Sequence, residues 1–172
     1  MRFTTEQWVR APLSDVFEFF CAPGNLLNIT PPEAHARIVS LDLVPIPGHA
    51  PELAGVGSTI RIDFRAAPFL NQRLGWTARI VELEWLRFFR DVQTAGPFRR
   101  FEHTHSFRAE DRRGSSGTVI RDEVNYELGL FGLLGSAAAR PMLWRMFHYR
   151  HKVTRKLLEG RGQGAAPQAN SD

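Results

Sequence analysis

Two histidines in an alternating segment are the residues best suited to acid–base chemistry. His103 and His105 alternate in step with Phe101 and Phe107, so in a β-strand all four side chains point to one face. Imidazole titrates near neutral pH, and a histidine oriented by a carboxylate can act as a general base. The sequence therefore predicts a candidate catalytic site on this strand face.

Asp122 is the predicted partner of these histidines. It lies on the apolar-bearing face of the next alternating segment, 118–128, and residues 112–117 between the two segments are typical of a hairpin turn. Pairing the strands about the centre of that turn places Asp122 opposite His103 or His105. The carboxylate is then expected to favour the charged imidazolium of its partner. A ligand contact without chemistry, or a buried polar pair that only satisfies itself, is equally compatible with this pattern.

The same residues suggest a metal site only weakly. Two imidazoles at alternating strand positions can bind one ion, with Asp122 as a third ligand. Each histidine would also need a second partner to orient its ring, and the sequence pattern offers none. Cys21 is the one cysteine of the chain, which excludes a disulfide framework and a multi-cysteine site. We therefore expect no metal and no cofactor.

The surrounding segments predict an α+β domain. Two short helices follow the first strand, one ending before Pro23 and one over 25–29. Short turns join the strands, which favours a mostly antiparallel sheet, with a register slip near Val81 and Glu82. The alternating pattern predicts strands over 3–10, 37–44, 58–65, 76–81, 85–94, 101–108 and 118–128.

A long terminal helix is predicted over 141–158, with Pro141 in its first turn. Its expected apolar stripe comprises Met142, Met146, Tyr149, Val153 and Leu157, flanked by Leu143, Phe147 and Arg150. We expect one domain over 1–158 and a disordered tail over 159–172. A twisted sheet that wraps this helix leaves a space between them, where a ligand can bind.

Motifs spread over residues 1–158 carry a family resemblance. They are Val9-x-Ala11-Pro12-x-x-x-Val16-Phe17-x-Phe19, Asn25-Leu26-x-x-Ile29-Thr30-Pro31-Pro32, Gly96-Pro97-Phe98-x-x-Phe101-x-His103-x-His105-x-Phe107, Thr118-x-Ile120-x-Asp122-x-Val124-x-Tyr126 and Phe147-x-Tyr149-Arg150. Together they resemble the SRPBCC superfamily, the START-like and polyketide cyclase/dehydrase-like proteins. The resemblance implies a helix-grip fold, in which a twisted antiparallel sheet wraps a long C-terminal helix. It does not choose between binding and catalysis, because one fold hosts many functions.

Three hypotheses for function follow. The first is a protein that binds a small hydrophobic or aromatic, polyketide- or lipid-like molecule between sheet and terminal helix. The second is a cyclase- or dehydratase-type enzyme, in which His103 or His105 is the base and Tyr126 or Arg150 polarises a carbonyl oxygen. The third is a lipid-surface protein that uses residues 130–134 and the basic terminal helix. The predicted ligand contacts are Phe17, Trp76, Phe101, His103, His105, Asp122, Tyr126, Phe147 and Arg150.

Charge and targeting signals limit the partners. The net charge is +4, from 22 basic and 18 acidic residues, and the excess falls from residue 140 onward. The rest of the chain is nearly neutral, so we expect no nucleic-acid partner and at most weak, salt-sensitive contact with a membrane surface. No secretory signal and no apolar run of about 20 residues are visible, so the cytoplasm is the expected location. The sequence leaves the oligomeric state open.

Overall fold

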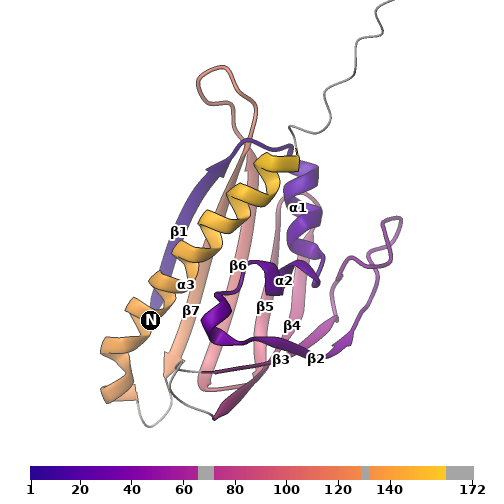
Figure 1. The fold of residues 1–172 in the computed structure, drawn as a ribbon. Helices are drawn as coiled ribbons and strands as arrows, with labels where there is room; N and C mark the ends of the chain where they lie inside the picture. Colours follow the sequence, from indigo (N-terminus) through magenta and orange to yellow (C-terminus); the bar gives the residue numbers. More distant parts are fainter. Residues whose placement is uncertain (66–71, 129–131, 162–172) are drawn as a thin grey trace, which may run out of the picture.

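The protein, described by a computed structural model, forms one antiparallel sheet that curves around a long helix (Figure 1). The structure describes residues 1–65, 72–128 and 132–161, without the side chains of 132–139 and 161. Its seven strands follow the order β1-β7-β6-β5-β4-β3-β2. They are β1 (Arg2–Val9), β2 (Arg37–Asp42), β3 (Thr59–Arg65), β4 (Arg73–Glu84), β5 (Phe88–Ala95), β6 (Phe98–Ala109) and β7 (Thr118–Leu128).

Four helical segments accompany the sheet. They are α1 (Leu13–Cys21), α2 (Asn25–Asn28), the 3₁₀ helix η1 (Pro32–Ala34) and α3 (Gly132–Arg161). Figure 1 shows α3 crossing the sheet from the end of β7 to the side of α1. The predicted α+β architecture is therefore confirmed. None of the helices within the described residues is long and apolar enough to cross a membrane.

The hairpin that joins β6 and β7 sets the register of the central strands. Its tip is closed by reciprocal backbone hydrogen bonds between Arg112 and Ser115. Arg113 and Gly114 both adopt positive φ, of 51° and 76°. Two consecutive left-handed residues are the mark of a type I′ turn, whose twist matches that of the flanking strands. The predicted turn is confirmed, and it places His105 directly opposite Asp122.

The predicted slip in β4 is also confirmed. The pairing of β4 with β5 shifts register between Ile80 and Glu82, leaving Val81 without a partner. Ile80 is buried, whereas Val81 and Glu82 both face solvent. Such a bulge bends the strand and increases its twist, which helps the sheet to curve around α3.

The terminal helix differs from the sequence prediction in its start and its inward face. It begins at Gly132, and Pro141 lies in its interior, because the alanine-rich residues that precede the proline favour helix strongly. The helix also continues to Arg161, and residues 162–172 of the predicted tail lie outside the described residues. The buried face carries Leu143, Phe147, Thr154 and Leu158, whereas Met142 is 51% exposed.

This rotation of the inward face has a simple cause. The prediction followed hydrophobicity alone and so did not include Thr154 or His151 in the inward face. Residues 147, 151, 154 and 158 are spaced by four, three and four positions, which is one face of a helix. Thr154 is fully buried and His151 is mostly buried on that face. Polar residues therefore occupy the centre of the stripe that packs on the sheet.

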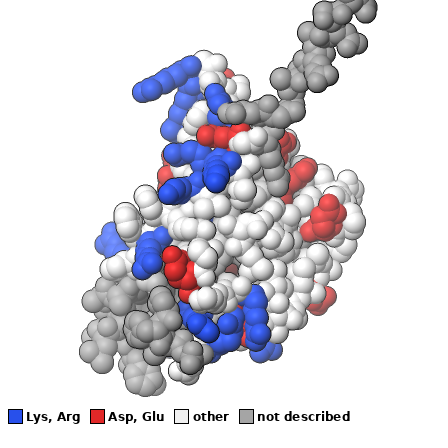
Figure 2. Space-filling model, viewed as in Figure 1, with Lys and Arg blue, Asp and Glu red and all other residues white. Residues whose placement is uncertain are grey.

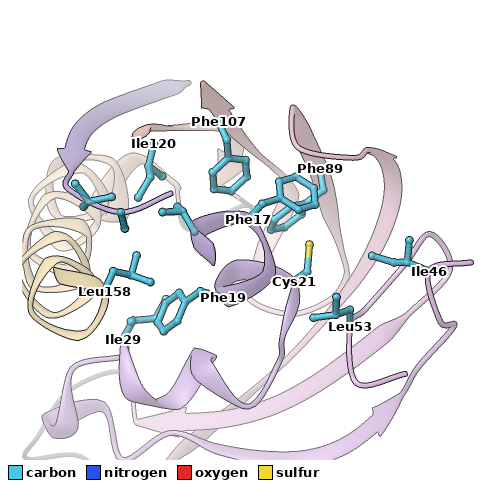
Figure 3. Close-up of a cluster of buried hydrophobic side chains, with 13 residues drawn as sticks. Phe17, Phe19, Cys21, Ile29, Ile46, Leu53, Phe89, Phe107, Ile120 and Leu158 are labelled. Carbon is cyan, nitrogen blue, oxygen red and sulfur yellow. The ribbon is translucent and has the colours of Figure 1, made fainter. Parts of the chain in front are cut away.

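Two apolar clusters form the core. In the first, Phe17 of α1 points between Phe89 and Phe107 of the sheet, and Leu158 of α3 packs nearby (Figure 3). The second contains Phe3, Phe101, Val124, Tyr126, Leu143 and Phe147. His103 and His105 lie between Phe101 of the second cluster and Phe107 of the first on β6, and Asp122 lies between Ile120 and Val124 on β7.

Candidate functional site

Four polar side chains of neighbouring strands meet on the inner face of the sheet. His103 and His105 of β6 and Asp122 of β7 are buried, with 5%, 6% and 2% of their surface exposed. Asp91 of β5 lies directly opposite His103, and Asp122 lies directly opposite His105. The strand pairing therefore brings together the three predicted residues and adds a fourth.

Asp122 binds both imidazoles. Nε2 of His103 lies 3.0 Å from Oδ1 of Asp122 in a buried hydrogen bond. Nδ1 of His105 lies 2.8 Å from the same oxygen, although it is not aligned as a hydrogen bond. The second oxygen, Oδ2, lies 3.7 Å from Nε2 of His151 on α3. One carboxylate thus faces three imidazoles.

Burial and neighbouring charges act in opposite directions on the pKa values of Asp122 and His103. Burial tends to raise the pKa of Asp122, but the imidazoles of His103 and His105 outweigh it and hold that pKa well below its usual range. Burial and the neighbouring His105 lower the pKa of His103, and the opposing effect of Asp122 does not compensate. Asp122 therefore favours the imidazolium of His103, as the sequence predicted, but desolvation outweighs this effect and leaves the pKa of His103 lowered.

Asp91 is the functional candidate that the sequence analysis missed. Its Oδ2 lies 3.9 Å from Nδ1 of His103 and 3.9 Å from Nε2 of His105. Burial raises the pKa of its carboxyl group, with His103 and Arg150 acting in the opposite direction. A signal was available, because a hairpin centred on Pro97 pairs Asp91 with His103 by the same reasoning that paired His105 with Asp122.

A cavity of about 350 Å³ opens beside this cluster. Its walls come from β3 to β6, from the segment between α1 and β2, and from α3. Five of the predicted ligand contacts line it, and Asp91 joins them: Trp76, Phe101, His103, His105 and Arg150. Most of the remaining lining is apolar, as at Ile60, Ile62, Phe89, Leu143 and Met146.

The other four predicted ligand contacts lie behind the cavity wall. Phe17 and Tyr126 belong to the two core clusters. Asp122 is covered by the two histidines it binds. Phe147 is 1% exposed and packs edge-on against His103, with ring centroids 5.4 Å apart. These four side chains pack behind the residues that line the cavity and do not form its surface.

Known structures share this architecture. A protein from Thermus thermophilus, TTHA0849, is 20% identical, with a TM-score of 0.60 over 94% of this chain and 99% of that one. The major latex-like protein 151 of Panax ginseng is 16% identical, with a TM-score of 0.59 over 92% and 97%. BexL, a di-domain ARO/CYC from the BE-7585A biosynthetic pathway, is 17% identical, with a TM-score of 0.63 over 92% and 46%.

These similarities identify the fold. The chain has the helix-grip fold. The fold implied by the sequence resemblance to the SRPBCC superfamily is therefore confirmed. No family model and no curated protein matches the sequence.

Arg150 reaches the cavity of this helix-grip domain from α3. Its guanidinium carbon lies 5.5 Å from the centroid of the Phe147 ring, and its Nε is buried without a hydrogen-bond partner among the described residues. Burial lowers the pKa of Arg150, and the carboxylates of Asp122 and Asp91 oppose that shift. A buried donor with no partner favours an acceptor group on a ligand.

The outer surface carries no single basic face in the view of Figure 2. Lys and Arg side chains form separate groups there, with Asp and Glu side chains between them. The membrane hypothesis depends on residues 130–134. Of these, residues 130 and 131 and the side chains of 132–134 lie outside the described residues, so the structure does not test that segment.

Cys21 lines the cavity but is chemically protected. It is 2% exposed, and burial, with a smaller effect of Glu18, raises its pKa to about 12. We expect its reaction with a disulfide reagent at pH 8 to be roughly a thousandfold slower in the native protein than after denaturation, because the thiolate is the nucleophile. Absorbance of the released thiolate, with and without guanidinium, measures both rates. Fast labelling of the native protein would show that Cys21 is exposed and ionised.

Proposed function

We propose that the protein binds a small hydrophobic or aromatic molecule in the cavity between the sheet and α3. The observation that carries this proposal is the cavity itself, about 350 Å³ in volume and mostly apolar in its lining. Ligand pockets typically measure about 300–1,000 Å³ and combine apolar walls with a few oriented polar groups. This volume favours a compact molecule rather than a long-chain lipid.

Charged groups at the cavity suggest the polarity of the ligand. Arg145 and Arg150 of α3 both line it, and Asp91 is the lining carboxylate that lies close to the histidines. An aromatic molecule with an acidic or carbonyl oxygen directed at Arg150 would satisfy the buried Nε. The rest of the molecule would lie against apolar side chains such as Trp76 and Ile62.

A cavity-filling variant tests this proposal. Ala78 lines the cavity from β4, so Ala78→Phe should weaken binding of the fluorescent probe 8-anilinonaphthalene-1-sulfonate by about tenfold or more. Thr77→Phe introduces the same ring on the opposite face of the strand and should leave the affinity unchanged. Equal affinities in both variants, after correction for the folded fraction, would contradict a cavity site. Native mass spectrometry of the purified protein would show whether a small molecule is retained.

Catalysis of the cyclase or dehydratase type is the second candidate. The observation that favours it is that His103 and His105 both line the cavity while Asp122 fixes their rings from behind. Tyr126 does not line the cavity, which leaves Arg150 to polarise a carbonyl oxygen. A base at this position should accelerate deuterium uptake next to the carbonyl of a small aromatic ketone. The proposal fails if wild type and His105→Gln exchange at the same rate.

A further inference from the structure

The geometry points to a binding site for one divalent transition-metal ion, formed by Asp91, His103 and His105. The atoms that would bind the ion are Oδ2 of Asp91, Nδ1 of His103 and Nε2 of His105, and they lie within 4.8 Å of one another. Two imidazoles and one carboxylate form a donor set suited to Zn²⁺, Co²⁺ or Fe²⁺. This inference does not depend on the identity, or the existence, of an apolar ligand in the cavity.

The positions of the imidazole protons support this assignment. An ionised Asp122 only accepts hydrogen bonds, so the nitrogens that face it carry the protons, namely Nε2 of His103 and Nδ1 of His105. In the metal-binding form of each ring, the opposite nitrogen presents its lone pair toward Asp91. Three acceptor atoms converge, and at 3.9 Å from Asp91 neither nitrogen is within hydrogen-bond distance of its carboxylate. A cation between the three atoms removes the repulsion among their lone pairs.

Asp122 supplies the second partner that the sequence pattern lacked. Histidines that bind metals usually donate their other ring N–H to a carboxylate or carbonyl, which fixes the tautomer and the ring orientation. Here one carboxylate serves both rings, at 3.0 Å and 2.8 Å, and is 2% exposed. The same residue was considered above as a third ligand. The structure places Asp91 in that role and Asp122 behind the histidines.

The charges of the cluster also favour a cation. Two carboxyl groups, those of Asp91 and Asp122, interact with one guanidinium, that of Arg150. Both carboxyl groups are buried or nearly so, since the Asp91 side chain is 17% exposed and that of Asp122 is 3% exposed. Bringing a divalent ion into this cluster replaces solvation that the carboxylates lost on folding.

The site would leave coordination positions open toward the cavity. Bonds of about 2.0–2.2 Å in a tetrahedral arrangement place ligand atoms about 3.3 Å apart, so each 3.9 Å separation between Asp91 and a histidine must shorten by roughly half an ångström. Three protein ligands leave at least one position for water or for an oxygen of a cavity-bound molecule. That arrangement is typical of reactive rather than structural metal sites.

Metal titration of the full-length protein tests the site. After treatment with a chelator, we expect Zn²⁺ to bind with one ion per chain by calorimetry. Asp91→Asn preserves the shape of the side chain and should weaken this binding by about tenfold or more, and Asp122→Asn by about 10–100-fold. The matched control is His148→Gln, which alters an exposed histidine stacked on Trp144 and should leave the affinity unchanged.

A measurement on the wild type keeps the test independent of how the variants fold. Bound Co²⁺ should shift two exchangeable imidazole N–H protons in the NMR spectrum, those of His103 and His105 that face Asp122. No stoichiometric binding of Zn²⁺ or Co²⁺, or equal affinity in wild type and folded Asp91→Asn, would overturn the assignment. Loss of binding in His148→Gln would assign the ion to the surface instead. None of these outcomes depends on binding of the fluorescent probe. Failure of the metal site and failure of the cavity ligand site can therefore be told apart.

Discussion

Phe147→Ala is expected to lower the free energy of unfolding by about 3–5 kcal/mol, the usual cost of truncating a fully buried phenylalanine. The ring is 1% exposed and lies against Phe3, with centroids 5.3 Å apart, and against His103. Its removal leaves a void between α3 and the sheet that neighbouring rings cannot fill without leaving their own contacts. Domains of this size are stable by about 5–15 kcal/mol, so the loss is a large fraction of the total. Urea unfolding followed by fluorescence measures it.

An exposed neighbour on the same helix provides the control. Trp144 precedes Phe147 by almost one turn and is 61% exposed. Trp144→Ala should change stability by about 0.5 kcal/mol or less, since exposed side chains contribute little to the core. Similar losses in both variants would mean that α3 does not pack on the sheet through Phe147. The probe affinity of the folded Phe147→Ala fraction should also change, because His103 and Arg150 line the cavity and rest on this ring.

Asp122→Ala is expected to lower the free energy of unfolding by a similar amount, about 3–5 kcal/mol, for a different reason. Removing the carboxylate leaves buried ring N–H groups without an acceptor in a desolvated site, at a cost of about 1–3 kcal/mol for each unsatisfied group. Here His103 and His105 both lose the acceptor that fixes their rings. Asp122→Asn should cost less, because its amide oxygen can still accept one hydrogen bond. Chemical unfolding of chelator-treated protein gives the free energy of unfolding of the wild type, Asp122→Ala and Asp122→Asn.

The adjacent residue is a matched control for this variant. Glu123 lies on the opposite face of the same strand and forms an ion pair with the exposed Arg2. Glu123→Ala removes a carboxylate from a solvated pair and should cost about 0–1 kcal/mol. If both alanine variants cost the same, the buried cluster does not contribute to stability in the way the structure indicates.

The same cluster predicts that the metal-free protein loses stability in acid. The pKa of His103 is lowered in the fold, so the unfolded chain takes up that proton first once the pH falls below about 6.5. The pKa of Asp122 is also lowered, so the unfolded chain binds that proton first below about pH 4. For these two groups the unfolded state holds more protons, which lowers stability as the pH falls, whereas the raised pKa of Asp91 acts in the opposite direction and offsets part of the loss. Stability that rises between pH 7 and pH 5 in the presence of chelator would contradict this.

Much of the site was predictable because it depends on local rules. Alternation placed His103, His105 and Asp122 on inward faces, and two residues of the 112–117 segment with positive φ fixed the hairpin register. Asp91 could have been found in the same way from the turn at Gly96 and Pro97. It was missed because the strand over 85–94 was predicted without assigning its side chains to the two faces.

The sequence by itself determined the strand faces and the β6–β7 hairpin to within one register step, because strand periodicity and turn chemistry act over a few residues. Its motifs also carried the resemblance that implies the helix-grip fold. Only the tertiary structure decided the rotation of α3, which brought His151 and Thr154 inward and left Met142 exposed. It also determined the shape of the cavity and the direction of the pKa shift of His103. A helix turns about its axis until its side chains fit the sheet, and a cavity is the volume that distant side chains fail to fill. A pKa likewise depends on how completely water is excluded, which no short segment of the chain encodes.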